Sequence, residues 1–296
     1  MPSLKDLRNR IKSVKNTQQI TKTMKMVAAA KVRRARMKCE AARPYAEKLN
    51  DVLVGLAKGT GKVGGPLLLS GYADVKTVRL VVISADRGLC GGFNANLGKE
   101  VIAKVKELQS QGKTVEIMTV GKKVKDILKR DYQELLIDNV EDSGKNISYE
   151  LATEIGNKVM AAFEAGECHE VILFYNKFVN MMVQQPTVQY LAPFKVEESG
   201  ESVEMTASVE YEPEEEVILK DLLPRNVSVQ ILNAMLESSA AEQAARMTAM
   251  DSATTNAGQM ISRLSLEYNR TRQAAITTEL TEIVAGAGSV KSSAGT

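Results

Sequence analysis

The two ends of this sequence, residues 3–43 and 225–296, contain no proline. Proline interrupts both helices and sheets, so its absence over such lengths limits what these stretches can form. Both are rich in Ala, Lys, Arg, Glu, Gln and Met, which favour helices. The sequence therefore predicts one long helix at each end of the chain.

Apolar and small residues recur in both stretches at alternating steps of three and four. In the first stretch they are Leu4, Leu7, Ile11 and Val14 and, after a slip of one residue, Thr17, Thr21, Met24 and Ala28. In the second they are Met247, Met250, Thr254, Ala257, Ile261, Leu264 and Tyr268, with Ile276, Leu280 and Ile283 beyond. This spacing is typical of a coiled coil. A helix over 226–284 would be about 90 Å long, which argues against the alternative, an ordinary bundle of two helices.

The middle of the chain alternates between two kinds of pattern. Short β-branched runs, predicted as strands, occupy 77–84, 114–120, 134–137 and 170–179. Helical patterns occupy 94–112, 122–130 and 148–166. This alternation indicates a mostly parallel sheet, and residues 181–193 add a strand at its edge because Pro186 is poorly tolerated in a central one.

The order of these parts predicts the fold class. It is an α/β, Rossmann-like domain inserted between two terminal helices that pair as a long antiparallel coiled coil. The expected boundaries are a first helix at 1–57, the α/β domain at 75–195, an acidic connecting segment at 196–225, a second helix at 226–287 and a flexible tail at 288–296.

Charge is segregated along the chain. Residues 1–43 hold thirteen Lys/Arg and two Asp/Glu, a net +11, whereas residues 196–221 hold ten Asp/Glu and one Lys, a net −9. These two segments should face different partners. Nucleic acid is disfavoured for the basic helix, because its cations share the helix with a regular apolar seam and no aromatic residues are interleaved.

The glycine-rich turn at Gly88-Leu89-Cys90-Gly91-Gly92 follows a predicted strand and precedes a predicted helix, as a phosphate-binding loop would. It lacks the Lys-Ser/Thr pair of a Walker loop and the spacing of a dinucleotide fingerprint. Cys90 has no C-x-x-C partner, so we interpret it as a small buried thiol in a tight turn. The glycines are expected where backbone segments pass closely. Three separated cysteines and one histidine, His169, indicate no metal site and no cofactor.

Three motifs carry a resemblance to a known family. The segment "IKSVKNTQQITKTMKMVAAAKVRRA" resembles the N-terminal helix of the γ subunit of F-type ATP synthases, and "ISADRGLCGGFNANL" is similar to its central loop. The segments "EQAARMTAMDSATTNAGQMI" and "YNRTRQAAITTELTEIVAGA" are similar to its C-terminal helix. The likeness extends from about residue 3 to 287.

The resemblance implies a rotor subunit of the central stalk that does no bond chemistry itself. Such a subunit turns with the membrane c ring and couples proton translocation to ATP synthesis or hydrolysis at the β subunits. The implied partners are the α and β subunits of the hexamer, the ε subunit and the c ring, with one copy of γ per complex. Because the family pattern begins near residue 3, we expect a bacterial protein, peripheral on the cytoplasmic face of the inner membrane.

The resemblance also implies roles for individual residues. Positions matching β-subunit contacts or coupling residues are Met24, Lys25, Arg246, Arg272, Gln273, Thr277 and Glu282. Positions matching the region that meets the c ring and ε are Tyr211 and Glu212. The rotor–stator loop contains Asp86, Arg87 and Cys90. The alternatives are a structural coiled-coil adaptor without a rotary role and, third, an enzyme that uses the α/β domain.

Overall fold

The structure is a computed structural model that describes residues 3–60, 66–141, 144, 147–194 and 215–293. It divides into two compact units, one formed by residues 1–27 with 249–296 and one formed by residues 28–248. Two long helices, α1 (Leu4–Thr60) and α6 (Glu215–Ser293), contribute to both units. Each unit is described separately below.

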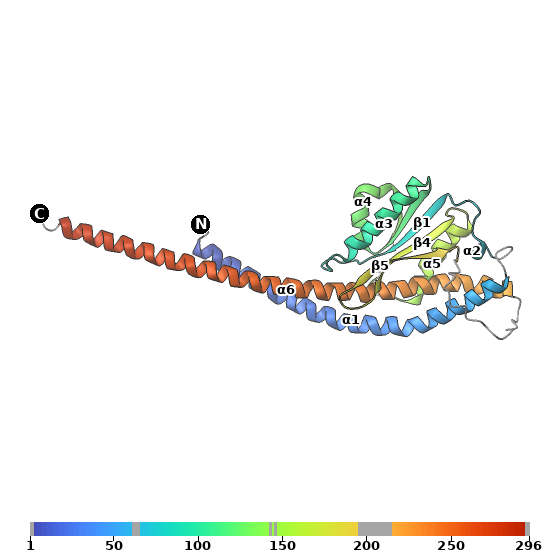
Figure 1. Cartoon of the computed structure of the whole chain (residues 1–296), viewed down its shortest axis with the longest axis horizontal. Coiled ribbons are helices and arrows are strands. Elements are labelled where there is room, and N and C mark those ends of the chain that lie inside the picture. The colour runs from blue at the N-terminus through green and yellow to red at the C-terminus, as the bar shows by residue number, and fades with distance from the viewer. Residues whose placement is uncertain (1–2, 61–65, 142–143, 145–146, 195–214, 294–296) are drawn as a thin grey trace. The chain divides into compact units, whose positions relative to one another are not determined.

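The larger unit contains a five-stranded sheet in the order β3-β2-β1-β4-β5 (Figure 1). Its strands are β1 (Thr77–Ile83), β2 (Thr114–Val120), β3 (Leu136–Val140), β4 (Glu170–Phe178) and β5 (Gln184–Ala192). The first four are mutually parallel, and β5 runs antiparallel to β4. The edge position of β5 explains how Pro186, which lacks an N–H donor, is accommodated there.

Helices cover both faces of this sheet. On one face α3 (Phe93–Ser110) and α4 (Lys122–Tyr132) bury apolar side chains such as Leu97 and Leu128 against β1 and β2. On the other face α5 (Tyr149–Glu164) packs together with the inner parts of α1 and α6 and with the short helix α2 (Leu67–Ser70). Alternate residues of each strand therefore enter two separate cores, as expected for a sheet buried on both faces.

Parts of α1 and α6 belong to the core of the larger unit. Leu53 and Leu56 of α1 and Leu219 and Ile231 of α6 have no exposed surface. Burying a leucine or isoleucine fully stabilises the fold by about 1.5–3 kcal/mol. The two helices are therefore integral to the α/β domain and are more than connectors to it.

In the smaller unit, α1 and α6 pair along the predicted seam. Leu7, Thr21, Met250 and Ala257 are buried there. The hydroxyl of Thr254 donates to the hydroxyl of Thr21 at 2.8 Å. The predicted fold class, an α/β domain inserted between paired terminal helices, is confirmed.

The seam differs from the predicted one at residue 17. Thr17 is exposed, and the neighbouring Gln18 is half-buried instead, with its amide Nε2 near the carbonyl oxygen of Thr254 at 3.5 Å. Gly258 allows this approach, because a Cβ there would lie 3.0 Å from the same amide nitrogen. Gly258 of α6 therefore leaves room for the side chain of Gln18, and the contact on α1 lies at residue 18 instead of residue 17.

The ends of the long helices also differ from the expected boundaries. Helix α6 begins at Glu215, before the predicted residue 226, and includes Pro224. Leu219 and Leu223 are buried in the core on the N-terminal side of this proline, and their burial offsets the roughly 3 kcal/mol cost of proline within a helix. At its other end α6 continues to Ser293, into the expected tail, and α1 continues to Thr60 and includes Pro44.

The third strand is also displaced. A 3-10 turn occupies Gln133–Leu135, and β3 follows it at Leu136–Val140 instead of the predicted 134–137. The strand "LIDNV" is only partly buried, so its apolar pattern is weak and its limits are hard to locate from sequence.

Candidate functional site

The turn between β1 and α3 has an unusual backbone. Leu89 adopts a positive φ of 61°, and Gly91 adopts a φ of 58°. A positive φ is uncommon for a residue with a branched side chain, so Leu89 is strained. Its side chain nevertheless remains 62% exposed. Of the three glycines in the turn, only Gly91 has a positive φ, so only there does the backbone conformation favour glycine.

The close backbone approach lies elsewhere, between the end of β1 and Gly121. A Cβ on Gly121 would lie 2.2 Å from the carbonyl oxygen of Ser84, and the φ of Gly121 is 100°. By contrast, a Cβ on Gly88 would meet no atom within 4 Å. The expectation that the turn glycines mark a close passage is therefore wrong for Gly88, and the residue that needs to be glycine follows β2.

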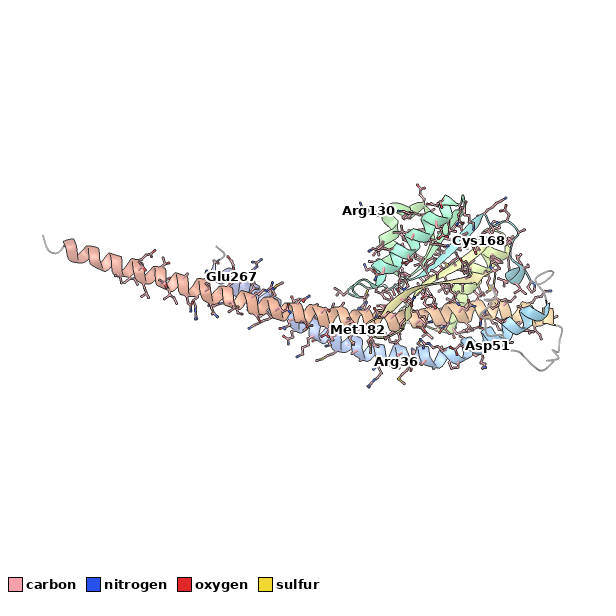
Figure 2. All side chains as sticks on the ribbon, in the orientation of Figure 1. Arg36, Asp51, Arg130, Cys168, Met182 and Glu267 are labelled. Carbon is pink, nitrogen blue, oxygen red and sulfur yellow. The ribbon has the colours of Figure 1, made fainter. Side chains whose placement is uncertain are left out.

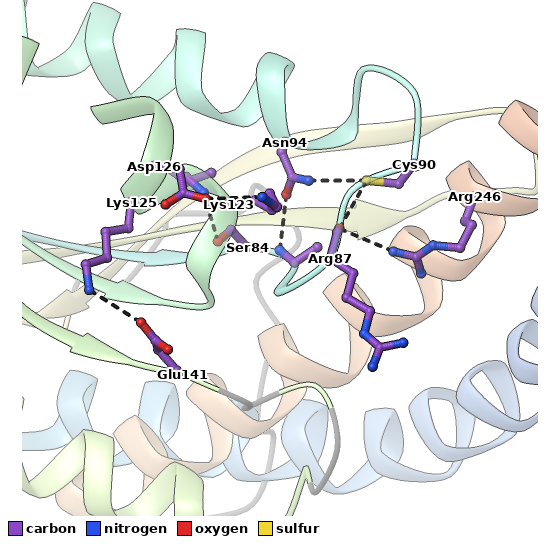
Figure 3. Close-up of polar contacts among 11 residues, drawn as sticks. Ser84, Arg87, Cys90, Asn94, Lys123, Lys125, Asp126, Glu141 and Arg246 are labelled. Carbon is purple, nitrogen blue, oxygen red and sulfur yellow. Dashed lines mark hydrogen bonds and ion pairs between the residues drawn. The ribbon is translucent and has the colours of Figure 1, made fainter. Parts of the chain in front are cut away.

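Asn94 holds the two ends of the turn together. Its Oδ1 accepts a hydrogen bond from the backbone N–H of Ala85 at 3.1 Å, and its Nδ2 donates to Sγ of Cys90 at 3.2 Å (Figure 3). Cys90 is 2% exposed, and burial raises the pKa of its thiol. A thiol that is buried and protonated is a poor nucleophile, which agrees with its interpretation as a structural residue.

Arg246 of α6 holds the same turn from outside. Its Nη2 donates to the backbone oxygens of Arg87 at 3.3 Å and Gly88 at 3.1 Å, as Figure 3 shows for Arg87. Its Nη1 pairs with Oε1 of Glu242 at 2.7 Å. Burial raises the pKa of Glu242, and the adjacent guanidinium opposes that rise. The predicted site residues Arg246, Arg87 and Cys90 therefore lie together around one turn.

A cleft of about 460 Å³ opens beside this turn. Its charged lining consists of the cations Lys31, Arg34, Lys38, Arg87 and Arg246 and the carboxylates Asp86 and Glu242. Oδ2 of Asp86 accepts a hydrogen bond from the backbone N–H of Gly144 at 3.2 Å. Five cations and two carboxylates leave the lining with a formal excess of three positive charges.

A second polar cluster, which the sequence did not indicate, joins α1, α6 and β4. The carboxylate of Glu237, only 3% exposed, accepts from Nη2 of Arg43 at 2.6 Å and from the backbone N–H of Phe178 at 2.9 Å. Burial and the neighbouring Glu237 raise the pKa of the Cys39 thiol to about 12. Because Glu237 and Cys39 are buried and Arg43 is paired with Glu237 within the chain, we interpret this cluster as structural.

The tip of the hairpin between β4 and β5 is apolar and exposed. Met182, labelled in Figure 2, is 74% exposed, and Val179 is 50% exposed. The hydroxyl of Thr248 donates to the backbone oxygen of Met181 at 3.2 Å, which ties the tip to α6.

In the smaller unit, Met24 and Lys25 lie on α1 and are half-buried. Nζ of Lys25 pairs with Oδ1 of Asp251 on α6 at 2.6 Å, and both side chains remain about half exposed, at 40% and 54%. Nearer the start of α1, Nη2 of Arg8 donates to the hydroxyl of Tyr268 at 2.9 Å.

Beyond Tyr268, α6 continues past the start of α1 (Figure 1). The predicted contact residues Arg272, Gln273, Thr277 and Glu282 are exposed on this part of the helix. Large apolar side chains are exposed there as well, between 48% and 71%, at Ile276, Leu280, Ile283 and Val284. Arg272 follows Asp251 by about 30 Å along the helix axis at 1.5 Å per residue, so this group is separate from Met24 and Lys25.

Two further predicted residues, Tyr211 and Glu212, lie outside the described residues. Within the part of the chain that the structure covers, no three His, Cys, Asp or Glu side chains are grouped so that they could hold a metal ion. Across the same residues, no helix has both the length and the apolar composition required to cross a bilayer.

Several residues around the turn were missed from the sequence, namely Leu89, Asn94, Gly121 and Glu242. The i,i+4 spacing of Glu242 and Arg246 could have indicated an ion pair on one helix face. The positive φ of Leu89 and the close approach at Gly121 depend on backbone geometry, for which the sequence offers no comparable signal.

Comparison with known proteins gives a consistent result. The family model described as ATP synthase matches residues 3–290. An ATP synthase gamma chain of Ruegeria pomeroyi is 53% identical over 289 residues, which are 97% of this chain and 99% of the relative. An ATP synthase gamma chain of Paracoccus denitrificans is 50% identical over 289 residues, with the same coverage of 97% and 99%.

Solved structures agree. A chain of the central stalk and c ring of the Tetrahymena thermophila mitochondrial ATP synthase is 28% identical, with a TM-score of 0.59, and the match covers 79% of this chain and 99% of that one. A chain of the Euglena gracilis mitochondrial ATP synthase has a TM-score of 0.70 at 21% identity, covering 97% of this chain and 94% of that one. The latter similarity supports the fold alone.

Proposed function

This chain belongs to the gamma-chain family of ATP synthases, and from that premise we propose that it is the rotor subunit of a central stalk. In this role it turns with a ring of membrane c subunits and changes the conformations of catalytic sites on β subunits. It couples ion translocation to ATP synthesis or hydrolysis and carries out no bond chemistry itself.

The observation that carries this proposal is the exposed continuation of α6. From Ile276 to Val284 the helix presents large apolar side chains that its own chain leaves uncovered. Exposed apolar surface of this extent on a single helix marks an interaction surface. A helix end of this kind could insert into a channel that other subunits enclose.

The site residues divide into contact groups under this proposal. Met24 and Lys25 on the helix pair, and Arg272, Gln273, Thr277 and Glu282 on the end of α6, face β subunits. Asp86 and Arg87 beside the basic cleft face the lower rim of the hexamer, with Cys90 beneath them. Tyr211 and Glu212 face the c ring and ε.

Exposed polar contacts suit a rotating shaft for a physical reason. Ion pairs between exposed side chains contribute only about 0–1 kcal/mol each, so they can be exchanged as the shaft turns without creating a deep energy minimum. The proposed partners are the α, β and ε subunits and the c ring, with one copy of this chain per complex. The proposed location is the cytoplasmic face of a bacterial inner membrane, which the chain reaches through the c ring.

Affinity purification from detergent-extracted membranes tests the proposal. A tagged full-length chain should recover an ATPase that contains α, β and ε subunits and c subunits. Recovery of the chain only as a dimer with itself would favour the structural adaptor. Tight ATP binding by the purified chain would favour the enzyme.

A variant pair tests the contact assignment. Arg272→Ala combined with Gln273→Ala should reduce ATP-driven rotation or assembly of the complex. The matched control is Arg130→Ala with Gln133→Ala, since both residues are exposed, Arg130 in the last turn of α4 (Figure 2) and Gln133 directly after it. Unchanged torque and coupling in the first variant would contradict the assignment.

A further inference from the structure

Arg246 is engaged with its own chain on two sides. Its Nη2 donates to the carbonyl oxygens of Arg87 and Gly88, and its Nη1 is paired with Glu242. Its side chain is only 12% exposed. A guanidinium occupied in this way has little surface left for direct contact with another subunit.

The two carbonyl groups that Arg246 binds immediately precede the strained residue of the turn. Leu89 has a φ of 61° and a side chain that is 62% exposed, so burial within the chain does little to offset its strain. A strained backbone persists only where its surroundings fix it. Here those surroundings are Arg246 on one side and the amide of Asn94 on the other.

We propose that Arg246, held by Glu242, is a positioning residue that fixes the peptide groups of Arg87 and Gly88 and thereby sets how the side chains of Arg87 and Leu89 are presented. Its effect on coupling is exerted through this turn rather than through its own contact with a β subunit. This inference rests on the proposed function, which identifies the assembly that the turn contacts.

The geometry requires arginine in particular. One planar guanidinium reaches two carbonyl oxygens with one nitrogen and a carboxylate with another. A lysine ammonium is a single point charge on a flexible stem and cannot reproduce this fork. Arg246→Lys therefore keeps the charge but no longer positions the turn. This variant distinguishes a positioning role of Arg246 from a role of its charge alone.

Cys90 provides a direct measure of whether the turn is closed. Its sulfur lies beneath the turn, is 2% exposed, and accepts from Nδ2 of Asn94. The experiment is alkylation of the full-length chain with iodoacetamide, followed by peptide mapping to assign each modified cysteine. Cys168, which is fully buried and directly precedes β4 in the sequence, serves as the internal reference.

Arg246→Gln should increase the alkylation rate of Cys90, expressed per thiolate, about tenfold and leave Cys168 unchanged, because hydrogen bonds from a charged donor are lost from the turn. The rate is taken from a pH profile for each variant, because the charge of Arg246 also lowers the pKa of the Cys90 thiol. Arg246→Lys should resemble Arg246→Gln. The matched control is Arg225→Gln, which removes an i,i+4 pair with Asp221 from an exposed part of the same helix and should leave both rates unchanged. An unchanged Cys90 rate in Arg246→Gln would overturn the proposal.

The second measurement uses the assembled ATPase and compares proton pumping with ATP hydrolysis. Arg246→Gln, Arg246→Lys and Glu242→Gln should all lose coupling, in parallel with the rise in Cys90 alkylation. Restored coupling in Arg246→Lys while Cys90 stays reactive would show that the charge itself is what matters, which overturns positioning. If the unsubstituted chain enters no ATPase, the proposed function fails while the alkylation result still decides the role of Arg246.

Discussion

The two compact units hold the same pair of helices together by different means. In the unit of residues 28–248, α1 and α6 share an apolar core and the pair of Arg43 with the buried carboxylate of Glu237. In the other unit they share small side chains and partly exposed contacts such as that of Lys25 with Asp251. The first arrangement stabilises a domain by itself. The second leaves side chains available to other subunits.

Helix pairing in this chain therefore serves two purposes, fixing the geometry of one unit and leaving side chains exposed in the other. Fully buried leucines and the buried, paired carboxylate of Glu237 fix one geometry, because any displacement exposes apolar area or leaves that carboxylate unpaired. Contacts between exposed polar groups tolerate displacement at little cost. Substitutions in the two kinds of contact should therefore differ in their effect on stability.

Glu237→Ala should have the largest effect. It removes a charged hydrogen bond from Arg43 and leaves the buried N–H of Phe178 without an acceptor, which should lower the free energy of unfolding by about 3–5 kcal/mol. Urea denaturation of the full chain measures this. The double variant Arg43→Met with Glu237→Leu should lose less, because no unpaired charge remains, although the N–H of Phe178 still lacks its acceptor. Equal losses in the two variants would show that the unpaired charge of Arg43 does not contribute to the effect of Glu237→Ala.

A matched pair of leucine truncations comes next. Leu56→Ala removes a side chain with no exposed surface and should cost about 2–5 kcal/mol of unfolding free energy. Leu280→Ala removes one that is 57% exposed and should change stability by no more than about 0.5 kcal/mol. If the end of α6 is an interaction surface, Leu280→Ala should instead weaken retention of the chain in the ATPase. A large stability loss in Leu280→Ala would contradict this division.

The buried thiols predict a loss of stability in alkali. Burial raises the pKa of Cys168 from its ordinary value of 9.0 to about 11. The unfolded chain therefore releases this proton above pH 9 while the folded chain retains it, so the free energy of unfolding falls as pH rises from about 9 to about 11. Urea midpoints at successive pH values measure the slope. Cys168→Ala should reduce the slope without abolishing it, because burial also raises the pKa of the Cys39 and Cys90 thiols. An identical slope in that variant would exclude the Cys168 thiol as a cause.

The same contrast explains what could be predicted from sequence. The strands β1, β2 and β4 and the paired helices follow from residue periodicity, because each buries a regular set of side chains. The early start of α6 could not be predicted, because Pro224 signals a break and only the core contacts of Leu219 and Leu223 override it.

The candidate site was predicted in part. Arg246, Arg87 and Cys90 were identified from the resemblance, and the structure brings them together around one turn. The reason for their proximity was not predictable, since it depends on the carbonyl oxygens of Arg87 and Gly88 and on the strained φ of Leu89. Every residue carries the same backbone carbonyl group, so the sequence cannot indicate which carbonyl oxygen a side chain binds.

The smallest expected effect concerns the ion pair of Lys25 and Asp251 in the unit of residues 1–27 and 249–296. The nitrogen and oxygen are 2.6 Å apart, but the side chains are 40% and 54% exposed, so water and salt screen the attraction. A double-mutant cycle with Lys25→Met and Asp251→Asn should give a coupling energy of about 0.2–1 kcal/mol that decreases as salt is added. A contact this exposed can open at little cost. A coupling energy several times larger, insensitive to salt, would mean that this pair fixes the helices as firmly as Arg43 and Glu237 do.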